Sequence, residues 1–215
     1  MLSSLVGGLE PLKDGILALA EAGNLYAVNA LFRVFLEHTL KVLEIFQRAT
    51  KEKTDDFANA YLKTILKEAA DYKKALTAAG LTLDKTEQYI LHPWFEEAGK
   101  LKPGELDELA RPFQYKKLIE TINASYGFTK PNVLSKIVPN FAELSGFVHG
   151  GPSMQLIMNA HAHPGAKAAR LEQVAGLVVA MFCSAKRWLL MLAGTFRPEF
   201  AAAEDELSAA MAKYL

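Results

Sequence analysis

The segment from Asn24 to Thr50 constrains the fold of this chain more than any other part of the sequence. It contains no proline and no glycine, and its apolar residues recur at helical spacing on most sides of one continuous helix. Asn24 follows Gly23 and is a suitable N-cap for that helix. Because a long helix with so much apolar surface must be covered by other elements, the sequence predicts a central, largely buried helix.

Helical periodicity dominates the rest of the sequence too, and no run alternates in the manner of a half-buried strand. Residues 81–112 are predicted to be less regular, because Pro93 interrupts one helix there and Pro103 favours a turn before a short helix. The fold class we predict is all-α, a single-domain helical bundle over residues 1–215 with two long central helices, a late long helix and several short helices. The further predicted helices cover 9–22, 55–79, 84–98, 113–125, 140–148 and 166–193, with a last one that begins near Pro198.

Composition and charge limit the classes of function that this chain is expected to have. A chain of 215 residues that is 51% hydrophobic and 22% charged fits one ordinary globular domain. The 24 basic and 24 acidic residues give no overall field toward nucleic acid or anionic membrane, so such binding needs a local patch. The start of the chain lacks the features of a signal peptide, and the apolar run 174–185 is shorter than a membrane span. We therefore expect a cytoplasmic protein with no membrane partner.

Three polar residues interrupt the apolar surface of the central helix. Asn29, Arg33 and Glu37 recur every four residues, so they share one face. If that face is buried, its side chains need further hydrogen-bond partners. Ser145 and His149, also four residues apart, are candidates from a later predicted helix. We therefore predict that these five residues form a polar cluster, which either fixes helix packing or binds a small anionic ligand.

The sequence LFRVFLEH in the central helix, together with the later ELSGFVHGG, resembles an uncharacterised family of bacterial helical domains related in organisation to the HEPN superfamily. Many HEPN proteins are metal-independent ribonucleases that carry an arginine followed, after four to six residues, by a histidine. Arg33 and His38 match that spacing. The resemblance thus implies a catalytic set of Arg33, His38 and His149, in which a histidine acts as general base or acid and Arg33 stabilises the phosphorane charge.

Helical geometry gives Arg33 a different nearest neighbour. Positions five apart on a helix lie about 140° apart, whereas positions four apart share a face. Glu37 is therefore expected to be the closer partner of Arg33, with His38 on another side.

No motif for a metal, a nucleotide-binding loop or a nucleophilic serine accompanies these residues. His161 and His163 precede Pro164 in a predicted loop, and two histidines without a third ligand make a weak metal site. We therefore expect neither a cofactor nor a metal. The sequence favours a non-enzymatic helical interaction or ligand-sensing module, with a metal-independent HEPN-type endoribonuclease as the alternative. The candidate partners are a second copy of the chain, as a homodimer, RNA, or a small anionic ligand.

Overall fold

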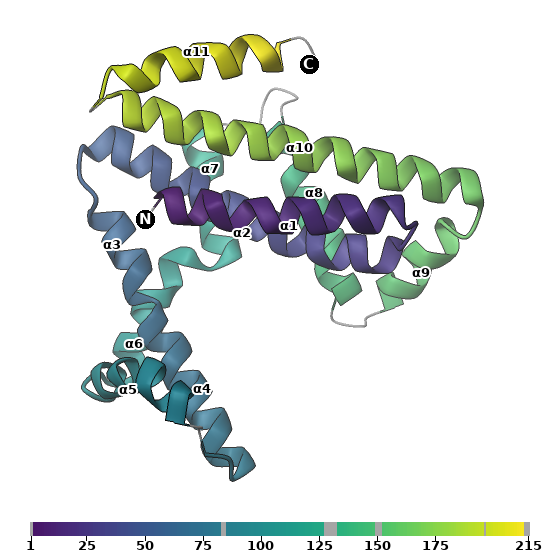
Figure 1. The fold of residues 1–215 in the computed structure, drawn as a ribbon. Coiled ribbons are helices and arrows are strands. Elements are labelled where there is room, and N and C mark those ends of the chain that lie inside the picture. Colours follow the sequence, from purple (N-terminus) through teal and green to yellow (C-terminus); the bar gives the residue numbers. More distant parts are fainter. Residues whose placement is uncertain (1, 83–84, 127–132, 149–151, 196, 213–215) are drawn as a thin grey trace.

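The computed structural model describes residues 2–82, 85–126, 133–148, 152–195 and 197–212, and every regular element within these ranges is a helix (Figure 1). The predicted all-α fold class is confirmed. The elements are α1 (Leu2–Glu21), α2 (Leu25–Glu52), α3 (Asp56–Lys63), α4 (Ile65–Ala79), α5 (Lys85–Gly99), α6 (Pro103–Ala110), the 3₁₀ turn η1 (Arg111–Phe113), α7 (Tyr115–Tyr126), α8 (Val133–Val148), α9 (Pro152–Ala160), α10 (Pro164–Gly194) and α11 (Glu199–Met211).

Helix α2 is the centre of the bundle. It packs against α1, α7, α8 and α10, and its Phe32 and Phe35 side chains are completely buried. The side-chain oxygen of Asn24 accepts a hydrogen bond from the Ala27 backbone N–H at 3.1 Å, which makes Asn24 the N-cap that the sequence predicts. The hydrophobic core therefore forms around α2, and the other bundle helices cover it.

The late long helix, α10, lies against α1 and α2 through buried apolar side chains such as Val174 and Val178 (Figure 1). Helix α11 packs on the outer side of α10. By length and composition alone α10 is able to cross a membrane, a test that core helices of globular proteins also pass. In the bundle α10 serves as a packing element.

Helices α3 to α6 form an arm that projects from the bundle (Figure 1). Helices α4 and α5 lie side by side, and the arm joins the bundle through α3, α6 and η1. Phe113 of η1 packs on Phe57 and Tyr61 of α3, with ring centroids 4.8 and 5.1 Å apart. Within α4 only Ala69 is buried, so most of this helix faces solvent. The arm is thus the part of the described chain with the least core of its own.

Two predicted helices have different limits in the structure. The first begins at Leu2 instead of residue 9 and contains Pro11, because Leu2, Val6 and Leu9 are buried in the core and tertiary packing compensates for the hydrogen bond that proline removes. The predicted helix 55–79 is divided at Thr64, whose hydroxyl donates to the Tyr61 carbonyl at 2.7 Å.

The middle and late segments are more helical than predicted. Helix α5 continues through Pro93 without interruption, and α8 begins at Val133, seven positions earlier than predicted, and contains Pro139. Helix α9 was not predicted at all. Proline discourages a helix locally, but buried side chains such as Phe95 and Ala98 after Pro93 help to maintain the helix, and single-sequence patterns do not reveal such contacts.

Candidate functional site

Polar side chains follow one face of α2 over almost its whole length. Arg33 donates to Glu37 at 3.2 Å, and Lys41 donates to the other carboxylate oxygen of Glu37 at 3.1 Å. The expected pairing of Arg33 with Glu37 is therefore present. Because successive members lie three or four residues apart, we call the whole set the α2 stripe: Asn29, Arg33, Glu37, Lys41, Glu44, Arg48 and Glu52.

In the second half of the α2 stripe the order of the charges is reversed, with one cation between two carboxylates. Arg48 donates to Glu44 at 3.0 Å and to Glu52 at 2.9 Å. The Glu44 side chain is only 2% exposed, so its charge depends on Arg48. The hydrogen bonds to these carboxylates raise the pKa of Arg48 above its ordinary value.

Aromatic rings from other helices cover the cations of the α2 stripe. This cover ties α3 and α8 to α2 and leaves the Arg33 and Glu37 side chains only 20% and 29% exposed. The Tyr115 ring of α7 stacks on the Phe141 ring. The ring centroids lie 4.7 Å from the Arg33 guanidinium (Phe141), 5.8 Å from the Lys41 ammonium (Tyr61) and 4.8 Å from the Arg48 guanidinium (Phe57).

Burial and neighbouring charges change the acidity of three groups in this region. Burial acts to raise the pKa of Glu37, but attraction and hydrogen bonding by Lys41, with attraction by Arg33, bring that pKa below its ordinary value. Burial lowers the pKa of His38, and Lys41 lowers it further against the opposing effect of Glu37. Burial raises the pKa of Tyr115 to about 12, although Arg33 opposes the rise.

The structure describes two of the three residues proposed as catalytic, Arg33 and His38. Arg33 engages Glu37 and Phe141, and no hydrogen bond or ion pair joins it to His38 within the described ranges. Helix α8 packs on α2, yet no hydrogen bond joins the half-buried Ser145 to Arg33 or Glu37 in the part of the chain that the structure describes. His149 lies outside the described residues, so its membership of the polar cluster stays a prediction.

Asn29, at the start of the α2 stripe, lacks the partners that its burial demands. Its side chain is 0% exposed, and neither its amide nitrogen nor its oxygen has a hydrogen-bond partner among the residues with described positions. Leaving a buried polar group unpaired costs about 1–3 kcal/mol. An unpaired amide of this kind calls for a specific explanation, of which an absent ligand or water is one.

A polar hollow of about 400 Å³ lies one turn before Asn29, where the first turns of α2 and α10 meet the end of α9. We call it the α2–α10 hollow. Its polar groups come from Asn24, Tyr26, His161 and Lys167. Its apolar wall comes from Leu25, Met158 and Ala162.

Lys167 is the cation of this hollow. Its ammonium nitrogen lies 3.7 Å from the position that a Cβ on Gly23 would occupy, and Gly23 has a φ of +69°, which favours glycine. Lys167 is half-buried as a residue, and its ammonium group has no hydrogen-bond or ion-pair partner within the described ranges. The end of α1 lies beside it, and helix C-termini attract cations, which helps to place the charge here.

The two loop histidines have different roles. His161 Nδ1 lies 2.8 Å from the Ile157 carbonyl oxygen and so carries a proton, which leaves Nε2 available to a ligand. His163 is the N-cap of α10 and accepts from the Gly165 N–H at 3.2 Å through Nδ1. No group of three or more metal-ligating side chains occurs among the described residues. The predicted loop is present between α9 and α10, and both histidines lie in it.

Sequence patterns alone missed Lys167, since nothing in its local sequence brings it near Gly23. They also missed the aromatic cover, although Phe57 and Tyr61, four residues apart, carried a usable signal. Searches with family models, against curated proteins and against solved structures return no match to this chain. The proposed function therefore rests on the geometry and chemistry of the sites.

Proposed function

We propose that the protein is a non-enzymatic helical ligand-sensing module that binds a small anionic ligand in the α2–α10 hollow. The observation that carries this proposal is Lys167, a half-buried residue that lines the hollow and has no ion-pair partner among the described residues. An unpaired cation inside a concave site attracts a phosphate or carboxylate group.

The surroundings of Lys167 favour an anion as well. Both α2 and α10 begin at the hollow, and the N-terminal ends of long helices carry partial positive charge. His161 and Tyr26 add polar side chains to the lining of the same hollow. A volume of about 400 Å³ lies in the range of small-ligand sites. Leu25 and Met158 give an apolar wall for the uncharged part of such a ligand.

Thermal unfolding with glycerol 3-phosphate, and with glycerol as the uncharged match, tests the proposal. At about ten times a millimolar Kd, binding adds about 1.4 kcal/mol to the free energy of unfolding. For a chain of this size that raises Tm by about 3–6 °C. We expect the rise with glycerol 3-phosphate alone, and its loss in Lys167→Met.

The matched control is Lys116→Met, which removes an exposed lysine of α7 outside the hollow. It should keep the full rise in Tm. If Lys167→Met lowers Tm but glycerol 3-phosphate never stabilises the unmodified protein, Lys167 only stabilises the end of α1 and the proposal is wrong.

The alternative is a metal-independent HEPN-type endoribonuclease, and the lowered pKa of His38 is the observation that favours it. A neutral imidazole near pH 7 can act as a general base. This alternative also requires Arg33 to break its hydrogen bond with Glu37 and to face a groove that admits RNA. Such a groove would have to form between two copies of the chain. Cleavage of single-stranded RNA that persists in EDTA and is lost in folded Arg33→Ala and His38→Ala variants would establish it in place of the sensing module.

A further inference from the structure

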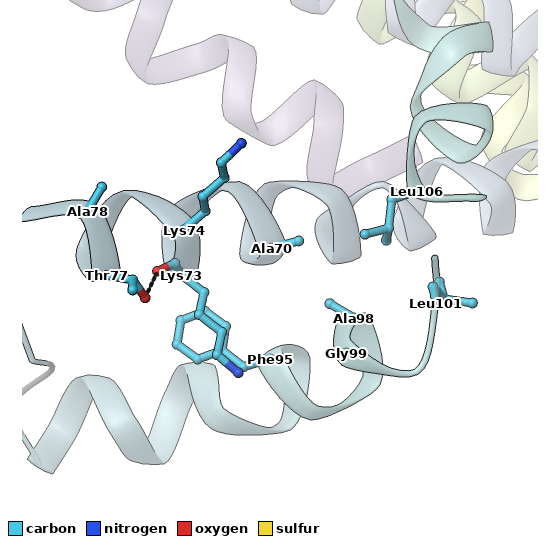
Figure 2. Close-up of a pocket in the computed structure, with 10 residues that line it drawn as sticks. All are labelled: Ala70, Lys73, Lys74, Thr77, Ala78, Phe95, Ala98, Gly99, Leu101 and Leu106. Carbon is cyan, nitrogen blue, oxygen red and sulfur yellow. Dashed lines mark hydrogen bonds between the residues drawn. The ribbon is translucent and has the colours of Figure 1, made fainter. Parts of the chain in front are cut away.

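The arm contains a second, different hollow of about 540 Å³ between α4 and α5, closed at one end by Leu101 and Leu106 (Figure 2). We call it the arm hollow. Small side chains line it on both helices: Ala70 and Ala78 on α4, and Ala98 on α5. The side chains of Phe95, Ala98 and Leu106 are almost fully buried and form its apolar floor.

The dimensions of the arm hollow fit a helix. From Ala70 to Ala78 it follows α4 for about 12 Å, which is slightly more than two helical turns. Thr77, Ala78 and Gly99 on its edges are exposed, so the floor is reached along an open side. An open groove of this length accommodates apolar side chains at i, i+3 or i+4, and i+7 of a partner helix.

The charged side chains that line the arm hollow are positive. Lys73 and Lys74 are its only charged lining residues, and neither has an ion-pair partner in the described part of the chain. Lys73 lies over the Phe95 ring, with its ammonium nitrogen 5.9 Å from the centroid, and Lys74 extends away from α5 at the rim (Figure 2).

Two acidic side chains of α4 and α5 with described positions are paired with other lysines. Asp71 accepts from Lys67 at 2.6 Å, and Glu97 pairs with Lys100. The two rim lysines therefore remain available to an acidic partner. The arm also exposes apolar side chains outside the hollow; they are Leu62, Tyr72, Leu81, Ile90 and Trp94.

We propose that the arm hollow docks an acidic amphipathic helix of a partner protein. Apolar side chains of that helix occupy the floor at Ala98 and Leu106, and its flanking carboxylates pair with Lys73 and Lys74. This inference goes beyond the ligand-sensing proposal and does not rest on it, because the arm hollow shares no lining residue with the α2–α10 hollow.

The test uses the full chain and two fluorescein-labelled helical peptides. Both peptides have leucines at i, i+4 and i+7; one has glutamates on the flanks of the leucine face, and the other has lysines there. Fluorescence anisotropy at low salt gives the Kd of each peptide. We expect the acidic peptide to bind at least about tenfold more tightly than the basic one, a difference of about 1.4 kcal/mol.

Two variants locate the binding. Lys73→Glu with Lys74→Glu should weaken the acidic peptide at least about tenfold, and Ala70→Phe, which fills the hollow, should weaken both peptides. The matched control, Lys51→Glu with Lys116→Glu, makes the same change in net charge at exposed bundle positions and should leave binding unchanged. Circular dichroism and Tm establish that each variant is folded.

Three outcomes would overturn the inference. The first is no binding of the acidic peptide up to about 1 mM. The second is equal weakening by the rim and control variants, which would indicate non-specific charge attraction. The third is displacement of the acidic peptide by palmitate at equal concentration together with retention of palmitate binding in Lys73→Glu/Lys74→Glu, which would identify the arm hollow as an apolar lipid site.

Discussion

Replacement of Arg33 by alanine tests whether the α2 stripe holds the bundle together. The change removes the hydrogen bond to Glu37, the contact with the Phe141 ring and most of the aliphatic stem. An ion pair at this spacing contributes about 0.5 kcal/mol, and a partly desolvated cation–aromatic contact about 1 kcal/mol. Loss of partly buried methylenes adds roughly another 1 kcal/mol. The expected decrease in the free energy of unfolding is therefore about 2–3 kcal/mol.

Urea unfolding followed by circular dichroism gives the free energy of unfolding. Two further variants separate the contribution of the ion pair from that of the ring contact. Glu37→Gln and Phe141→Leu, each alone and combined with Arg33→Ala, make two double-mutant cycles. We expect a coupling energy of about 0.5 kcal/mol between Arg33 and Glu37, and about 1 kcal/mol between Arg33 and Phe141. Arg33→Lys should recover part of the ion pair but less of the ring contact, because lysine lacks the planar guanidinium.

A loss below about 0.5 kcal/mol for Arg33→Ala, with no coupling to Phe141, would refute this reasoning. Such a result would place Arg33 among surface residues that contribute little, despite its 20% exposure. A stable Arg33→Ala variant that loses RNA cleavage would assign the residue to catalysis.

Three further changes have defined outcomes. Asn29→Leu removes an unpaired buried amide and should raise the free energy of unfolding by about 1–2 kcal/mol; a loss measured in urea would mean that the amide has a partner in solution. Because the folded pKa of Glu37 is lowered, its contribution is fully present above pH 4.5 and lost as the pH falls through the folded pKa, so Glu37→Gln should reduce the loss of stability on acidification below pH 4.5. Tyr115 has its pKa raised to about 12, so its contribution is fully present below the ordinary value of 10.0 and lost as the pH rises toward 12; absorbance at about 295 nm should show one late-titrating phenol that Tyr115→Phe removes.

The central helix was predictable because its determinants are local. Apolar spacing, the N-cap at Asn24 and the four-residue recurrence of Arg33 and Glu37 all lie within one segment, and helix geometry converts that spacing into a shared face. The stop of α4 at Gly80 was predictable for the same reason, since its φ of +64° favours glycine.

The aromatic cover and the α2–α10 hollow were not predictable, because they depend on where distant helices meet. Nothing near Lys167 in the sequence indicates that its ammonium group lies beside Gly23. Pro93 misled for a related reason: the local cost of proline in a helix is visible in the sequence, whereas the burial that offsets it at residues such as Phe95 is a tertiary property.

Helix α2, which carries the α2 stripe, lies between the two proposed binding regions. Helix α2 has 28 residues and is about 42 Å long, with the α2–α10 hollow at its N-terminal end. Near its other end, the rings of Tyr61 and Phe57 bind the base of the arm to Lys41 and Arg48. Between these points the charges of Arg33, Glu37 and Lys41 are paired along the helix. A ligand in the hollow and a partner on the arm would thus be held at opposite ends of one helix, an arrangement suited to a module that joins two binding events.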